Sequence, residues 1–160
     1  MSPELHISLS NLQSNIQFFQ RIIKKNTELS AVVKSDAYGL GIAKIVPEIE
    51  RYGVRSFFTA TISEAIKVRS YSHDSEIFTL NGFDFLKSNL YREHNITPII
   101  NNILEAQKFI EIFNQTQKVA IQLNTGMNRL GLDKQSLLEN IDIIKSLPLN
   151  LILSKHKPFF

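Results

Sequence analysis

The chain has 160 residues, 43% of them hydrophobic and 21% charged, which is typical of one globular domain. Its formal net charge is only +3 and its lysines are scattered, so we expect no nucleic-acid interface. The absence of cysteine excludes disulfides, thiolate metal sites and a cysteine nucleophile. The sequence has no signal-peptide pattern and no apolar run of transmembrane length, so we expect a cytoplasmic protein that does not enter a membrane.

The first predicted elements are a helix and a strand. Apolar residues recur at spacings of three and four within residues 9–23, the pattern of an amphipathic helix, with Ser8 and Ser10 as candidate caps. Residues 30–33 are apolar and partly β-branched, which indicates a short buried strand. A polar loop that contains two glycines follows at residues 35–41.

The same alternation continues along the chain. Further helices are expected at residues 42–49, 63–69, 85–91 and 103–113 and from about residue 136. Further strands are expected at residues 56–60, 76–80, 97–100, 118–123 and 149–153. Asp84 is a candidate cap of the helix at 85–91, and residues 136–139 (Ser-Leu-Leu-Glu) have the spacing of a capping box.

Regular alternation of strands and helices predicts a parallel sheet with right-handed crossovers. The pattern alone leaves two architectures open. An open doubly wound sheet is complete at this length, whereas a (β/α)8 barrel needs about 250 residues and rarely fewer than about 200. The number of strands slightly favours the open sheet, but the motifs described next favour the barrel.

Lys34 follows the first predicted strand in the segment 31–41, which reads AVVKSDAYGLG. In parallel β/α folds this end of a strand faces the active site, and a desolvated lysine amine there can form a Schiff base with an aldehyde. On position alone, a lysine that extends to water is the more frequent case. The glycines also resemble part of a dinucleotide-binding fingerprint, but the third glycine is missing and the loop is long for the usual tight turn.

The whole segment resembles the cofactor-lysine signature of alanine racemases, in which an Ala-Val-Val-Lys strand runs into Asp/Asn-Ala-Tyr-Gly-x-Gly. The resemblance implies that Lys34 is catalytic and holds pyridoxal phosphate covalently, and that Tyr38 reaches the cofactor phosphate. It also implies that the glycines let the backbone turn tightly. Leu40 stands where the family commonly has histidine, a departure that affects a local polar contact and not the lysine.

A second motif lies after the fifth predicted strand, where residues 123–131 read LNTGMNRLG. Without a family, it is a glycine-bearing loop that presents one arginine on the same face as Lys34, and lone loop arginines are usually surface residues. The segment resembles the family's Asp-Thr-Gly-Met-x-Arg-x-Gly motif. This implies that Arg129 hydrogen-bonds the phenolic oxygen of the cofactor and, with Met127, contributes to substrate binding near the carboxylate.

Two residues depart from the family's pattern beside this loop. Asn124 replaces the usual aspartate, and Gln122 stands where many members have a lysine that becomes carbamylated and supports the arginine. We therefore expect Arg129 to be held less firmly here.

A weaker similarity is found at residues 80–83, which read LNGF and resemble the family's Leu-x-Gly-aromatic turn. An ordinary strand-to-helix turn explains this segment nearly as well. The four histidines are scattered without metal-ligand spacing, so we expect no metal site.

The resemblance covers almost the whole chain and implies an incomplete (β/α)8 TIM-type barrel of about six βα units, one partial domain over residues 1–160. The family is homodimeric and interconverts L- and D-alanine, which supplies D-alanine for peptidoglycan. In the family a histidine near the cofactor ring follows the sixth strand, but His156 is displaced in unmatched surroundings and is not assigned that role. The change of pattern after Ser154 is what an interrupted or frameshifted gene would produce.

The family's second base is a tyrosine from a C-terminal β-domain, which we expect to be absent here. None of the four tyrosines occupies a matching motif, so we expect the isolated chain to be inactive. Two other hypotheses remain open. One is a non-catalytic remnant or split-gene product that binds pyridoxal phosphate weakly or not at all, and the other is a doubly wound domain unrelated to this cofactor.

Overall fold

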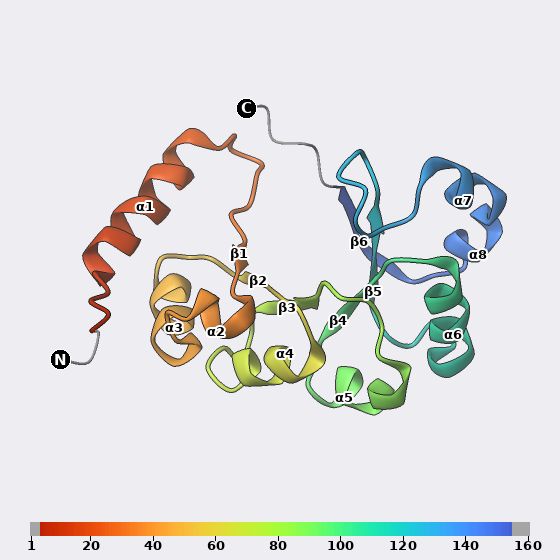
Figure 1. The fold of residues 1–160 in the computed structure, drawn as a ribbon, viewed down its shortest axis with the longest axis horizontal. Coiled ribbons are helices and arrows are strands. Elements are labelled where there is room, and N and C mark those ends of the chain that lie inside the picture. The colour runs from red at the N-terminus through yellow and green to blue at the C-terminus, as the bar shows by residue number, and fades with distance from the viewer. Residues whose placement is uncertain (1–3, 155–160) are drawn as a thin grey trace.

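The protein is described by a computed structural model over residues 4–154, so His156 lies outside the described residues. Its centre is a six-stranded parallel sheet whose strands follow one another in chain order (Figure 1). The six predicted strands are confirmed to within one or two residues at each end. They are β1 (Ala31–Val32), β2 (Ser56–Thr59), β3 (Glu76–Thr79), β4 (Thr97–Ile100), β5 (Val119–Leu123) and β6 (Leu149–Ser154).

Helical segments lie between the strands at the predicted places, with three differences. The expected loop after β1 contains a short helical turn, and the helix expected at residues 85–91 is divided into a 3-10 turn, η1, and a short α-helix. The helix expected from about residue 136 begins at residue 134 and is divided in two at residue 140. The helical elements are α1 (Leu9–Ile22), α2 (Lys34–Tyr38), α3 (Ile42–Arg51), α4 (Ile62–Arg69), η1 (Phe85–Lys87), α5 (Ser88–Glu93), α6 (Ile103–Phe113), α7 (Lys134–Glu139) and α8 (Ile141–Lys145).

The strand order decides between the two architectures. Figure 1 shows α3, α4, α5, α6 and α8 in an arc around one side of the curved sheet. A doubly wound sheet would reverse the strand order at a switch point and carry helices on both faces, so that alternative is wrong. Consecutive parallel strands with their helices outside are the arrangement of successive βα units in a (β/α)8 barrel.

The two faces of the sheet bury different apolar clusters, because side chains alternate along each strand. The outer cluster packs under the helices and includes Phe57, Ile77, Ile100 and Ile121. The inner cluster consists of Phe58, Phe78, Leu80, Ile99 and Ala120. Within it, the rings of Phe58 and Phe78 stack with 4.8 Å between their centroids. The inner face therefore offers a preformed apolar surface at the centre of the curve.

Two predicted helix caps are wrong. Asp133, and not Ser136, caps α7, because its carboxylate accepts a hydrogen bond from the Ser136 backbone N–H at 2.7 Å and the helix begins at Lys134. Asp84 precedes η1 but makes no capping hydrogen bond, and its carboxylate pairs with Lys87 at 3.4 Å. At α7 a neighbouring aspartate provides the cap, and at η1 the Asp84 carboxylate binds a neighbouring lysine instead of the helix end.

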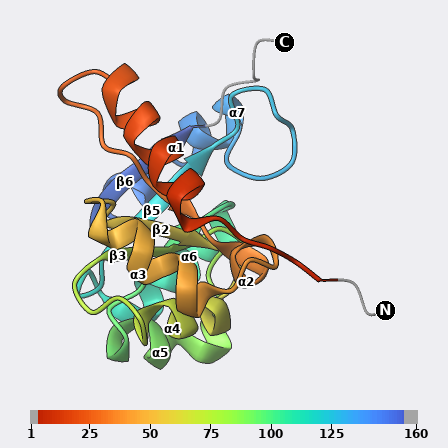
Figure 2. The same ribbon diagram turned by 90° about the vertical axis from the view of Figure 1, so that its left-hand side faces the viewer.

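The amphipathic helix α1 is confirmed, and Ser8 caps it through a hydrogen bond from the Asn11 N–H. Its apolar stripe is only partly covered, because α1 precedes β1 and stands beside that edge of the sheet, packed on α3 (Figures 1 and 2). Ile16 is buried, whereas Phe19 is 49% exposed. Among residues 4–154, no helix has the length and apolar character needed to cross a membrane.

Arg69, at the end of α4, joins the turns that follow α4 and α5. Its guanidinium donates hydrogen bonds of 2.8 to 3.0 Å to five backbone carbonyls, those of Ser72, His73, Ser75, His94 and Asn95. Burial lowers the pKa of Arg69 below its usual value, and nearby acidic groups oppose that shift. The contacts satisfy carbonyls that the helix ends and turns leave without partners.

Candidate functional site

The sequence-predicted site residues meet at one cavity, at the end of the inner face where β1 and β3 finish. Its volume is about 640 Å³, within the range usual for small-molecule sites. The apolar inner face contributes Val32, Phe58 and Leu80. The remaining lining residues are Ser30, Lys34, Tyr38, Asn81, Met127, Arg129 and Leu130. The cavity therefore combines an apolar base with one amine, one phenol and one guanidinium.

Lys34 and Tyr38 are presented by an unusual backbone turn. Residues 35–38 hold φ angles between 52° and 56°, so α2 winds in the left-handed sense without a glycine at any of these four positions. Left-handed backbone costs a residue with a Cβ atom roughly 1–2 kcal/mol. The turn brings the Lys34 Nζ to 5.8 Å from the centroid of the Tyr38 ring. Strain of this kind persists only where the surrounding structure holds it, and such places are often functional.

Helix α4 supplies the groups that hold this turn. The Glu64 carboxylate accepts a hydrogen bond from the Ser35 N–H at 2.9 Å. Asp36 accepts from the Ile42 N–H at 3.1 Å and from the Lys67 ammonium at 2.9 Å. The hydrogen bond from Lys67 and the Ile42 N–H lower the pKa of the Asp36 carboxyl.

The loop that carries Met127 and Arg129 is closed against the end of β5. Asn124 accepts hydrogen bonds from the backbone N–H groups of Gly126 and Asn128 at 3.2 and 3.0 Å, so it shapes the loop from within. Gln122 is buried on the inner face and donates to the Leu130 carbonyl at 2.8 Å. Over residues 4–154, neither side chain bonds the Arg129 guanidinium. Asn124 and Gln122, the two departures from the family's pattern beside this loop, thus hold the loop backbone.

The turn at residues 80–83 contributes Leu80 and Asn81 to the cavity. Gly82 has a φ of +96°, and a Cβ atom there would lie 2.6 Å from the Glu105 carboxylate. Glu105 accepts hydrogen bonds from the Asn101 N–H at 2.9 Å and the Phe83 N–H at 3.4 Å. Burial raises the pKa of Glu105, although these hydrogen bonds oppose the rise. The backbone conformation therefore favours glycine, and any side chain at this position would also displace the Glu105 carboxylate from its hydrogen bonds.

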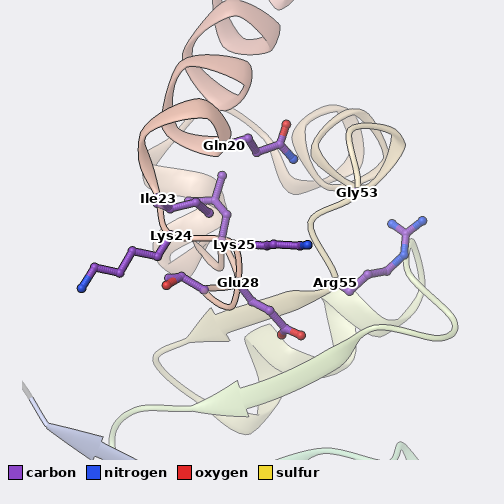
Figure 3. A pocket seen from close by; sticks show the side chains of 9 residues that line it. Gln20, Ile23, Lys24, Lys25, Glu28, Gly53 and Arg55 are labelled. Atoms are coloured by element: carbon purple, nitrogen blue, oxygen red, sulfur yellow. The ribbon is translucent and has the colours of Figure 1, made fainter.

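A smaller cavity of about 340 Å³ lies between the end of α1 and the loop before β2 (Figure 3). Lys25 and Arg55 lie along it, but the Arg55 guanidinium already donates to the backbone carbonyls of Glu50 and Val54. None of the residues predicted from the motifs lines this cavity. The cavity at Lys34 is therefore the candidate site.

Glu64 and Glu105 are the residues that the sequence analysis missed. Both lie three residues after a helix cap, Thr61 for Glu64 and Asn102 for Glu105, and each cap accepts from the glutamate N–H. This spacing is the sequence signal of a capping box, and it could have marked both helices. Their reach to other loops was not predictable, because it depends on how neighbouring strands are paired.

Comparison with known proteins identifies one family. The chain matches the family described as "Alanine racemase, N-terminal domain" over residues 7–154. The alanine racemases of Rickettsia prowazekii and Rickettsia canadensis are 32% and 35% identical over alignments 157 positions long, which cover 94% of this chain and 39% and 44% of those proteins. The crystal structure of alanine racemase from Bartonella henselae with covalently bound pyridoxal phosphate is 31% identical, with a TM-score of 0.86 over 95% of this chain and 46% of that one. The chain thus spans less than half the length of these relatives.

Proposed function

The chain belongs to the family of alanine racemase N-terminal domains, and from this we propose that its cavity holds pyridoxal phosphate on Lys34 and serves the interconversion of L- and D-alanine. One observation carries the proposal. Two motifs that lie far apart in the sequence supply the residues of a single cavity, Lys34 and Tyr38 from one and Met127 and Arg129 from the other.

The donor set of the cavity fits this cofactor. Lys34 offers an amine for the aldehyde, Arg129 a guanidinium for the phenolic oxygen, and Tyr38 a hydroxyl for the phosphate. Val32 and Phe58 offer apolar contacts to an aromatic ring. The Bartonella henselae relative carries covalently bound pyridoxal phosphate, which supports the same choice for this chain.

When bound, pyridoxal phosphate supplies a ring that delocalises the electron pair left on Cα when its proton is removed. Lys34 would hold the cofactor through its amine, and that amine, when free, would accept or return the Cα proton on one face. Arg129 and Met127 would orient the cofactor and the substrate carboxylate. The apolar base of the cavity would exclude water, so that the proton returns to carbon.

Inversion at Cα needs a proton acceptor on one face and a proton donor on the other. Lys34 can serve only one face. The family resemblance implies a tyrosine on a C-terminal β-domain for this role, so we assign the other face to a second subunit that carries such a domain. We also propose the cytoplasm as the compartment, by relation to the alanine racemases that the chain matches.

The test begins with covalent labelling. The chain is incubated with pyridoxal phosphate, reduced with borohydride and mapped by peptide mass spectrometry. We expect label at Lys34 that is lost in Lys34→Ala, whereas Arg129→Ala should change the absorbance spectrum and keep the label. Label spread evenly over surface lysines would refute the proposal.

A complementation assay separates catalysis from cofactor binding alone. The chain is mixed with a full-length alanine racemase whose own cofactor lysine has been replaced by alanine, and D-alanine formation from L-alanine is measured. We expect activity that depends on Lys34. Specific label without any activity would instead favour a non-catalytic domain that binds pyridoxal phosphate.

A further inference from the structure

The left-handed turn after β1 has an anchor outside its own segment. One oxygen of the Glu64 carboxylate accepts from the Ser35 N–H at 2.9 Å, and the other accepts from the Ala60 N–H at 2.7 Å. Ser35 is the residue directly after Lys34, and Ala60 directly follows β2. A single carboxylate on α4 thus joins the segments that leave two neighbouring strands.

A second contact from the same helix reaches the next residue of the turn. Lys67 lies one helical turn after Glu64, on the same face of α4, and its ammonium contacts Asp36 at 2.9 Å. Both partners of this ion pair are about half exposed, so its contribution is screened by solvent. The backbone hydrogen bonds of Glu64 are the stronger constraint, because hydrogen bonds to a charged acceptor exceed exposed ion pairs in strength.

We propose that Glu64 is a positioning residue: its carboxylate holds the left-handed turn of α2 and thereby sets the directions of Lys34 and Tyr38 into the cavity. Tyr38 is the fourth left-handed residue of the turn, and Lys34 is the residue immediately before the first of them, Ser35. Relaxation of the turn to ordinary backbone angles would redirect both side chains together. The inference rests on the proposed function for its cofactor readout, but its structural part can be tested without the cofactor.

The chain offers a matched control in Glu105. Glu105 occupies the same position in α6 as Glu64 in α4, and one of its carboxylate oxygens accepts from the N–H groups of both Asn101 and Phe83, while the other accepts from the Asn102 side chain. Glu105→Gln therefore perturbs a comparable carboxylate that does not contact the turn after Lys34. If both carboxylates served only overall stability, the two variants would lose label at Lys34 in proportion to their losses of stability.

The first measurement is amide hydrogen exchange of the whole chain without cofactor. In Glu64→Gln the amide group can accept through one oxygen only, so one backbone N–H loses its acceptor. We expect exchange at Ser35 or Ala60 to become roughly 10- to 100-fold faster, while exchange in the centre of the sheet is unchanged. Unchanged exchange at both sites would overturn the proposal.

The second measurement is the fraction of Lys34 labelled after borohydride reduction at limiting pyridoxal phosphate. We expect a loss of about tenfold in Glu64→Gln and a clearly smaller loss in Glu105→Gln, which acts on the turn at residues 80–83 and not on the segment that carries Lys34, although both variants lose stability in urea. If Glu64→Gln does not fold, Lys67→Met provides a milder perturbation with a smaller loss of label.

The outcomes separate the two proposals. Wild-type label at Lys34 that persists at full level in a folded Glu64→Gln variant would overturn the positioning role and leave the proposed function standing. Absence of specific label in the wild type would overturn the proposed function, and hydrogen exchange would then decide by itself whether Glu64 holds the turn.

Discussion

Replacement of Gly131 by alanine tests whether the loop that carries Arg129 is fixed by close contact with β5. A Cβ atom built on Gly131 lies 2.8 Å from the Gln122 carbonyl oxygen and 3.1 Å from the Asn124 nitrogen. Both groups are engaged in the hydrogen bonds that close the loop: Leu132 N–H donates to Gln122 and Asn124 N–H to Leu132, each at 2.8 Å. A methyl group at this position must therefore displace backbone and not a flexible side chain.

Two costs add in Gly131→Ala. The φ angle of +103° is unfavourable for a residue with a Cβ atom, at about 1–2 kcal/mol. Forcing a methyl group into filled space costs about 1–3 kcal/mol more. We therefore expect the free energy of unfolding to fall by about 2–5 kcal/mol.

The matched control is Gly39→Ala. Gly39 has a φ of +84°, but nothing lies within 4 Å of its built Cβ atom, so this variant carries the backbone cost alone. Both variants are unfolded in urea and followed by circular dichroism. Equal losses of stability in the two variants would refute the argument from close contact. Displacement of the loop should also alter the absorbance of bound cofactor in Gly131→Ala, because Arg129 moves with the loop.

Two further predictions concern the segment after α4. Arg69→Met leaves five carbonyls without their charged donor, so we expect the free energy of unfolding in urea to fall by about 2–4 kcal/mol. The control is Arg51→Met at an exposed ion pair, where we expect a loss of less than about 1 kcal/mol. Similar losses in the two variants would contradict the role given to Arg69. Burial alone would raise the pKa of Glu50, but hydrogen bonds from Ser72 and Ser75 and nearby positive charge lower it overall. Because the folded pKa lies below the unfolded one, this stabilisation is present above the ordinary glutamate pKa of about 4.3 and is lost as the pH falls through the folded value. The stability difference between wild type and Glu50→Gln should therefore shrink between about pH 5 and pH 3, and a constant difference would contradict the assignment.

The sequence by itself determined the order and position of the elements and the main residues of the candidate site. Strand positions follow from short apolar runs, because buried parallel strands present apolar side chains on both faces. Lys34 and Arg129 could be placed together in advance, because both follow strands and the carboxyl ends of parallel strands meet at one edge of the sheet. The positions need only local periodicity and the direction of the chain, whereas the roles expected for Lys34 and Arg129 come from the resemblance of their motifs to the alanine racemase family.

The tertiary structure decided between the two strand orders that the pattern left open, and it alone decided the cap of α7, the contacts of Asp84 and the handedness of the turn at Lys34. The strand pattern slightly favoured an open doubly wound sheet and the motifs favoured the barrel; consecutive pairing of β1 to β6, with the helices on one side, confirms the barrel arrangement. No local pattern predicts four left-handed residues without glycine at positions 35–38. That conformation depends on the Glu64 carboxylate, 29 residues away in the sequence, and on the Lys67 ammonium, which meet the turn only after β1 and β2 have paired. Such long-range contacts can outweigh local backbone preference, because a strained conformation persists where its surroundings over-determine it.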